Sequence, residues 1–158
     1  MLKGREIRGL TVSAGRKKEY VGRVRDLIID DQSGQVLGLV VTDPGMWQKS
    51  FFIKMENIKL LSKKGVYVPN KANVKRLRKD STTLLENNWL GSKLLSNKGE
   101  DKGTIADVLI KNGMVSGLEV SVGLVGDLHK RRDFIPWQNV RQKGNNFVEG
   151  VFHQDPLC

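Results

Sequence analysis

The chain has 158 residues, of which 39% are hydrophobic and 28% are charged, and this balance excludes extended disorder. The net charge is +10, and all of the excess lies in residues 1–80, which hold 18 Lys and Arg against 8 Asp and Glu, whereas residues 81–158 hold 9 of each kind. Such asymmetry favours an acidic partner, whether a protein, a nucleic acid or an anionic membrane surface, although a well-solvated surface accounts for it equally well.

Apolar runs and cysteine content bear on the cellular location. The longest apolar runs, 37–41 and 120–125, are far shorter than the roughly 18 residues that cross a bilayer. The N-terminus lacks the apolar centre of a secretion signal, and Cys158 is the only cysteine, so no intrachain disulfide can form. We therefore expect a cytoplasmic protein with no transmembrane segment, whose membrane association would be peripheral.

A long internal repeat organises the chain. Residues 22–30, Gly-Arg-Val-Arg-Asp-Leu-Ile-Ile-Asp, return as residues 103–111, Gly-Thr-Ile-Ala-Asp-Val-Leu-Ile-Lys, and the glycines and apolar residues after them return in the same order. Matching glycines and apolar positions describe a common backbone with a common core. The sequence therefore predicts two copies of one small domain.

The start of the repeat follows from matching Gly4 with Gly91. This alignment leaves residues 8–21 as an insertion in the first copy, and the insertion contains the basic run 15–18. Insertions at loop tips are places where a small domain acquires a separate function.

The predicted elements are short strands, because the apolar segments are rich in β-branched residues and are bounded by turn formers. In chain order, the strands after each repeated segment are 36–42, 50–53 and 65–68 in the first copy, and 117–122, 133–135 and 146–148 in the second. Asn112 and Gly113 favour a tight hairpin, and residues 31–34 form the longer equivalent turn. Five or six short strands per copy hide their edges most simply by curling up. We expect an all-β protein made of two tandem small antiparallel β-barrels.

The connection between the barrels carries one apolar pair at helical spacing among good helix formers. This pattern predicts a short helix that begins near residue 70 and ends near Asp80. The predicted organisation is a basic first barrel at 1–69, a linker at 70–88 and a second barrel at 89–158.

The order of motifs in each copy resembles the PRC-barrel family, which is named for the cytoplasmic domain of the photosynthetic reaction centre H subunit and also occurs in the ribosome maturation factor RimM. The shared order is an entrance glycine, Gly-x-hydrophobic-x-Asp with a hydrophobic run, a hairpin with glycine, and Phe-Ile-x-x-x-Asn-hydrophobic. The residues that carry it are Gly4, Gly22, Val24, Asp26, Gly34, Phe52, Ile53, Asn57 and Ile58 in the first copy, and Gly91, Gly103, Ile105, Asp107, Gly113, Phe134, Ile135, Pro136, Trp137, Asn139 and Val140 in the second. The resemblance implies a small β-barrel that docks onto other macromolecules and has no general catalytic role.

Two recurring polar positions invite a catalytic interpretation. Asp26 and Asp107 occupy the same place in the two copies, but general acid–base chemistry needs a second titratable group in reach, and none recurs with them. We interpret both as acceptors for backbone N–H groups, and we interpret Asn57 and Asn139 as turn residues that hydrogen-bond locally.

Metal and cofactor chemistry find no support in the sequence. His129 and His153 lie outside the repeated core and have no ligand at metal-binding spacing. No nucleophile motif, phosphate loop or dinucleotide fingerprint is present. We therefore expect no metal, no cofactor and no enzyme activity, and we keep a catalytic cleft between the barrels as a third alternative, recognisable by polar residues that do not recur.

The candidate partner-binding residues are cations in the basic first half and a large apolar pair in a connecting loop. They are Arg16, Lys17, Lys18, Lys75, Arg76, Arg78 and Lys79, together with Met46 and Trp47. Cations neutralise phosphate or carboxylate surfaces, and an exposed Trp gains buried area when a partner covers it. The alternatives are a solvated basic face and a Trp47 that plugs its own barrel.

The sequence thus predicts a non-catalytic docking or assembly module that binds an acidic protein or a membrane-associated assembly. The alternative is an RNA- or ribosome-associated factor. Packing of the two barrels through equivalent surfaces, and similar packing between identical chains, are both compatible with the repeat.

Overall fold

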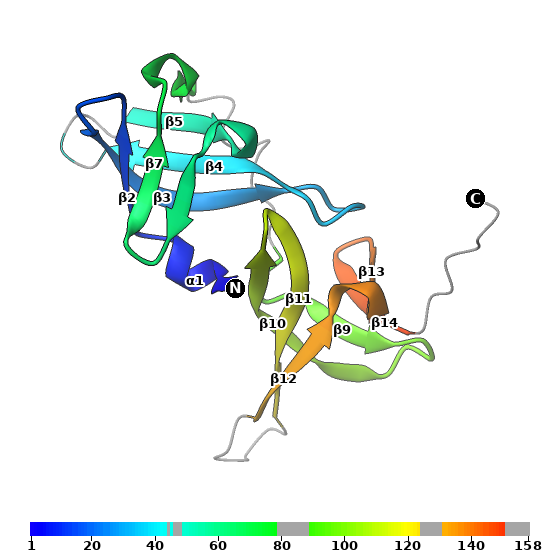
Figure 1. Ribbon diagram of the computed structural model, residues 1–158. Coiled ribbons are helices and arrows are strands. Elements are labelled where there is room, and N and C mark those ends of the chain that lie inside the picture. Colours follow the sequence, from blue (N-terminus) through cyan, green and yellow to red (C-terminus); the bar gives the residue numbers. More distant parts are fainter. Residues whose placement is uncertain (44, 46–48, 79–88, 124–130, 151–158) are drawn as a thin grey trace.

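The computed structural model describes residues 1–43, 45, 49–78, 89–123 and 131–150. Two strongly curled sheets, one from each half of the chain, make up most of it (Figure 1). Within these described residues the only α-helix is the short α1 (Gly4–Ile7). The predicted all-β, tandem barrel-like fold is confirmed, although the strand pairing of each sheet leaves its two edges open.

The first barrel is a sheet with the strand order β6-β7-β2-β3-β4-β5-β8. Its elements are β2 (Thr11–Ala14), β3 (Glu19–Ile29), β4 (Val36–Asp43), β5 (Lys49–Lys54), η1 (Met55–Asn57), β6 (Leu60–Ser62), β7 (Gly65–Val68), η2 (Lys71–Asn73) and β8 (Lys75–Arg76), where η denotes a 3₁₀ helix.

The second barrel is a sheet with the order β12-β11-β10-β9-β14-β13. Its elements are β9 (Lys93–Ser96), β10 (Asp101–Lys111), β11 (Met114–Val122), β12 (Arg131–Pro136), η4 (Trp137–Asn139), β13 (Val140–Lys143) and β14 (Asn146–Glu149). The N-terminal strand β1 (Leu2–Lys3) also belongs to this sheet, because it pairs with β10 beside Leu109 and Ile110. The N-terminus of the chain is thereby attached to the C-terminal barrel.

The two sheets repeat one topology with matching irregularities. The long strands β3 and β10 are both bulged immediately before an aspartate, between Val24 and Asp26 and between Ile105 and Asp107. One pair in each sheet, β2 with β7 and β9 with β14, is parallel and departs from the purely antiparallel expectation. The curling of each sheet brings its early strand, β2 or β9, beside the later strand β7 or β14, and the two strands run in the same direction.

The predicted start of the repeat is wrong by five residues. The Gly91 N–H donates to the Ile105 carbonyl at 2.8 Å, and in the first barrel the Gly9 N–H donates to the Val24 carbonyl at 2.7 Å, so Gly9 rather than Gly4 is the counterpart of Gly91. Both glycines have positive φ, +91° and +83°. The run 15–18 is consequently the ordinary β2–β3 hairpin tip, equivalent to the β9–β10 tip, and not an insertion. The prediction matched Gly91 with the wrong N-terminal glycine, because the residues before Gly9 belong to β1 and α1, which pack on the second barrel.

The helix predicted from residue 70 does not form. Residues 71–73 make the single turn η2, which Asn70 caps by accepting a hydrogen bond from the Ala72 N–H at 3.0 Å. Residues 75–76 then form β8 on the edge of β5, and the Leu77 N–H donates to the Ser50 carbonyl at 2.8 Å. An unpaired sheet edge offers backbone partners that a short helix with two apolar residues cannot match.

The buried side chains of the two barrels form one continuous core. Largely alternating residues of the strands point inward, and among the most buried are Val12, Leu39, Ile53, Leu94, Leu118 and Phe147. Trp89, which is 3% exposed, joins the halves: its ring stacks on Trp137 with centroids 5.3 Å apart, and its indole N–H donates to Asp31 of the first barrel at 3.1 Å.

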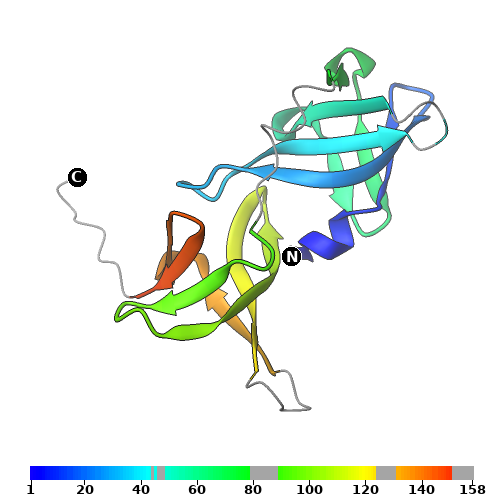
Figure 2. The ribbon, with the colours of Figure 1, turned by 180° about the vertical axis from the view of Figure 1, so that it is seen from behind.

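The barrels meet through equivalent hairpin tips, as the repeat made plausible. The Val36 N–H donates to the Gly113 carbonyl, and the Val115 N–H donates to the Gly34 carbonyl, each at 2.8 Å. These bonds are related by an approximate twofold axis, because Gly34 and Val36 are the counterparts of Gly113 and Val115. Figure 2 shows the β3–β4 hairpin reaching from the first barrel over the second.

Candidate functional site

The predicted basic residues that the structure describes gather at the end of the first barrel that points away from the second (Figure 1). Arg16, Lys17 and Lys18 form the exposed β2–β3 tip. The segment from η2 to Arg78 crosses the same end, and its side chains at Lys75, Arg76 and Arg78 are exposed. A Cβ on Gly15 would lie 3.2 Å from the Lys71 side chain, so the tip and η2 are in contact.

Some of this charge is engaged within the barrel. Lys71 forms an ion pair with Glu19, and Lys18 Nζ lies 5.4 Å from the centre of the Tyr67 ring. The equivalent tip of the second barrel carries one cation and one anion, Lys98 and Glu100. The excess of cations is therefore a property of the first barrel's end and not of the shared scaffold.

Three predicted partner-binding residues, Met46, Trp47 and Lys79, lie outside the described residues, and so do both histidines. Two further lysines of the first half, Lys63 and Lys64, precede β7 and lie at the end of that strand opposite to η2. There Lys63 forms an ion pair with Glu6 of α1 at 3.4 Å. The structure therefore separates cations that lie in one half of the sequence into two groups.

Asp26 and Asp107 serve the backbone, as interpreted from the sequence. Each carboxylate accepts the N–H of the next residue at 2.8 Å, directly after the bulge. Asp26 also accepts from the Arg8 guanidinium at 2.9 Å. Asp107 is 1% exposed and also accepts from the Arg5 backbone N–H at 3.3 Å, which fastens α1 to the second barrel. Both bulges thus have their free donors satisfied.

A charged cluster around Glu119 was not foreseen from the sequence. Glu119 is 7% exposed and is surrounded by cations: Arg132 donates to it, Lys3 Nζ lies 3.0 Å away and an Arg5 guanidinium nitrogen 3.6 Å away. Hydrogen bonds from Arg132 hold the pKa of Glu119 below its usual value, with Lys3 and Arg5 adding to the effect against desolvation. The sequence did offer a signal for this cluster, because Glu119 places a charge in an apolar strand at the position where the first copy has Val40.

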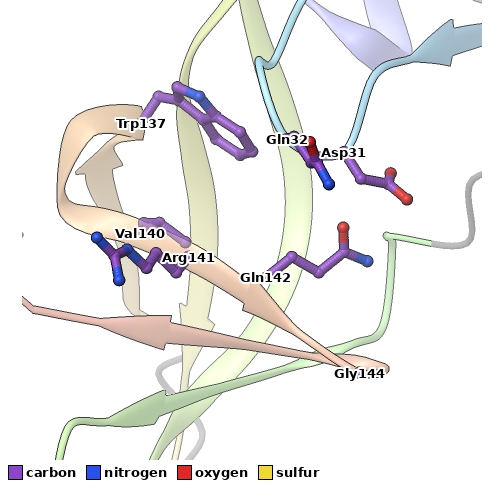
Figure 3. Close-up of a pocket in the computed structure, with 7 residues that line it drawn as sticks. All are labelled: Asp31, Gln32, Trp137, Val140, Arg141, Gln142 and Gly144. Atoms are coloured by element: carbon purple, nitrogen blue, oxygen red, sulfur yellow. The ribbon is translucent and has the colours of Figure 1, made fainter. Parts of the chain in front are cut away.

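A hollow of about 470 Å³ lies between the barrels, lined by Asp31 and Gln32 from the β3–β4 tip and by second-barrel residues that include Trp137, Arg141 and Gln142 (Figure 3). The Gln142 amide points toward Asp31, whereas Arg141 extends away from it. These polar residues do not recur, since Gln142 stands where the first barrel has Leu61. Among the described lining residues, Asp31 carries the only carboxylate.

In the part of the chain that the structure describes, no three His, Cys, Asp or Glu side chains come close enough together to hold a metal ion. Within the same residues, no helix has the length and apolar character needed to span a bilayer.

Comparisons with known proteins identify the repeated unit. The model of the PRC-barrel domain family matches the sequence twice, over residues 1–75 and 83–148. Among solved structures, the chain is similar to RimM from Pseudomonas aeruginosa, a candidate 16S ribosomal RNA processing protein, with 15% identity, a TM-score of 0.33 and coverage of 91% of this chain and 95% of that one. No curated protein matches the sequence. The two family matches cover most of the chain, which therefore belongs to the PRC-barrel domain family.

Proposed function

We propose that this protein is a non-catalytic docking module that binds an acidic partner through the basic end of its first barrel. The observation that carries the proposal is the exposed group Arg16, Lys17 and Lys18 at the β2–β3 tip, which contacts η2, with Lys75 and Arg76 exposed on the β8 strand that follows η2. Cations held in this way attract an acidic surface over distances of about a Debye length, roughly 8 Å at physiological salt.

The shared parts of the two barrels support a structural role for the scaffold. The recurring aspartates bond backbone beside the bulges, and the recurring glycines serve turns or admit a close neighbouring strand or ring, so the residues that distinguish the first barrel are its surface cations. A partner that is itself an acidic protein or a membrane-associated assembly fits a site made of flexible cations on a rigid hairpin. Rim cations of this kind act mainly on association rate and on salt dependence.

RNA binding is the second candidate, and one exposed aromatic favours it. Tyr20, which is 54% exposed, is the second residue of β3 and lies two positions after Lys18 of the basic tip. A ring beside cations can stack on an unpaired base while the cations neutralise phosphates. This candidate predicts a loss of affinity that is steep in salt, because phosphate contacts release counterions.

Matched charge variants test the proposal. The tip variant, Arg16→Gln, Lys17→Gln, Lys18→Gln, removes three positive charges from the β2–β3 tip. The control variant, Lys64→Gln, Lys98→Gln, Lys143→Gln, removes three positive charges from exposed lysines elsewhere. We expect crosslinked capture from the native cytoplasm to retain an acidic protein on the wild type and the control variant and to lose it on the tip variant.

Filter binding to total RNA at two salt concentrations separates the two candidates. If RNA is retained in a salt-sensitive way by the wild type and the control variant but not by the tip variant, RNA and not an acidic protein is the partner of the basic end. Equal capture by both triple variants in every assay would remove the basic end as the binding site.

A further inference from the structure

The two barrels differ at one edge of their sheets. In the first barrel β8 covers the outer edge of β5, with Arg76 opposite Phe51 and Lys75 opposite Phe52. The counterpart of β5 is β12, and β12 is the last strand of its sheet, with no strand of the described residues on its outer side. Among the described residues, the second barrel therefore presents an edge whose counterpart in the first barrel is covered.

Side-chain burial follows this difference. Phe52 and Phe134 are counterparts, and each ring lies over a glycine of the neighbouring strand, Gly38 and Gly117 respectively. Phe52 beside β8 is partly buried, whereas Phe134 is 51% exposed. An exposed aromatic at an open strand edge is a feature that folded proteins usually cover or charge.

The backbone groups on the open edge can be assigned from the first barrel. Ser50 accepts the Leu77 N–H, so its backbone faces outward toward β8, and Arg132 is its counterpart two residues before Phe134. Because outward-facing groups recur at every second residue, Arg132, Phe134 and Pro136 all present backbone groups at the edge. Pro136 offers only its carbonyl, which suits the end of an edge strand.

We infer that β12 pairs antiparallel with β12 of a second copy of this chain, about a twofold axis centred on Phe134. The outward-facing residues allow self-registers centred on Arg132, Asp133, Phe134 or Ile135, but centring on Ile135 pairs only residues 134–136, because Trp137 begins η4. Centring on Arg132 opposes two arginines, and centring on Asp133 opposes two aspartates, and like charges directly opposite each other destabilise a sheet. Centring on Phe134 opposes the two phenylalanines and sets Arg132 against Pro136 and Asp133 against Ile135, with no like charges opposed.

This register pairs the outward backbone groups of the edge except the Arg132 carbonyl, because Pro136 opposite it has no N–H, and it buries the exposed ring. In each copy the Phe134 N–H donates to the Phe134 carbonyl of the other copy, and the Arg132 N–H donates to the other Pro136 carbonyl. Opposed aromatic pairs of this kind contribute roughly 0.2–1 kcal/mol beyond two alanines. A single short strand buries less than the about 1,200 Å² of a standard interface, so the dimer is weak and forms at high protein concentration. The interface lies on the second barrel and leaves the basic end of the first barrel free.

Sedimentation velocity over a wide range of protein concentration tests the dimer. We expect the wild type to associate and Phe134→Lys to associate at least tenfold more weakly, because the register sets the two lysines opposite each other. Leu60→Lys is the control, since Leu60 is 53% exposed on the edge strand β6 of the other sheet. Far-UV circular dichroism checks that the variants fold. A wild type that stays monomeric throughout would overturn the inference.

Disulfide trapping tests the register in a Cys158→Ser background. Directly opposed residues of an antiparallel pair have Cα atoms about 4.5–5.5 Å apart, within the roughly 4.4–6.8 Å that a disulfide spans. Phe134→Cys should therefore crosslink two copies under mild oxidation, and Asp133→Cys should not. Crosslinking at 133 without crosslinking at 134 would contradict the register. Association that appears only when residues 151–158 are removed would assign the edge to that segment and would also overturn the inference.

Discussion

Replacing Gly34 with alanine should destabilise the protein far more than the same replacement at its counterpart Gly113. The two glycines have almost the same φ, +74° and +73°, so both variants bear the cost of about 1–2 kcal/mol for a left-handed non-glycine residue. Their surroundings differ: a Cβ on Gly34 would lie 2.6 Å from Trp137 Nε1, whereas one on Gly113 would lie 3.7 Å from Met55. Overpacking against a fixed ring typically adds about 1–3 kcal/mol.

We therefore expect Gly113→Ala to lower the free energy of unfolding by about 1–2 kcal/mol and Gly34→Ala to lower it by about 2–5 kcal/mol. The twofold relation also supplies the rescue, because Met55 is the counterpart of Trp137. Trp137→Met alone destabilises by removing the stack on Trp89, yet it should make Gly34→Ala cheaper by the steric part, about 1–3 kcal/mol.

Urea unfolding of the four proteins, followed by far-UV circular dichroism, gives this coupling energy as a double-mutant cycle. Independent sites add within about 0.3–0.5 kcal/mol. Additive effects of Gly34→Ala and Trp137→Met, or equal effects of the alanines at 34 and 113, would refute the steric explanation and with it the close contact of the hairpin tip with η4.

Three further predictions concern single polar groups. Glu119→Gln should lower the free energy of unfolding by about 1–3 kcal/mol at pH 7. The pKa of Glu119 in the folded protein lies below the unfolded value of 4.5, so the stability advantage of the wild type is complete above pH 4.5 and shrinks as the pH falls through the folded pKa. Urea unfolding at pH 7 and in acid measures this advantage, and a difference that stays constant with pH would be contrary evidence. Asp107→Ala should cost about 1 kcal/mol more than Asp26→Ala, since the former leaves buried N–H donors unsatisfied, and equal melting temperatures would speak against it. Trp89→Phe keeps a ring but removes the donor to Asp31, so it should cost about 1 kcal/mol, and a variant as stable as the wild type in thermal unfolding would show that this hydrogen bond contributes nothing.

The repeat made much of the fold predictable. Glycines with apolar residues at fixed spacing identified the repeated segment that forms β3 and β10, the hairpin after it and the Phe-Ile strand in each copy, since each feature depends on local backbone chemistry. The start of the repeat and the helix expected from residue 70 were mispredicted, because the glycine at 4 and the residues at 75–76 take their structure from distant partners, Asp107 and β5.

The candidate site was predictable to a smaller extent. A cluster of cations such as 16–18 is visible in any sequence because its members are adjacent. Two of the three cations around Glu119, Lys3 and Arg5, lie more than a hundred positions from it in the sequence, and only the passage of the N-terminus to the second barrel brings them to it.

By itself the sequence determined that this protein is a duplicated all-β unit with its excess charge in one half, because repeats, turn chemistry and composition are local properties of the chain. Only the tertiary structure decided that β1 belongs to the opposite barrel, that equivalent hairpins meet about an approximate twofold axis, and that a further strand of the described residues covers β5 whereas none covers β12. These are choices among strand partners, and strand pairing is settled by whichever free edge the folded chain brings within hydrogen-bonding distance.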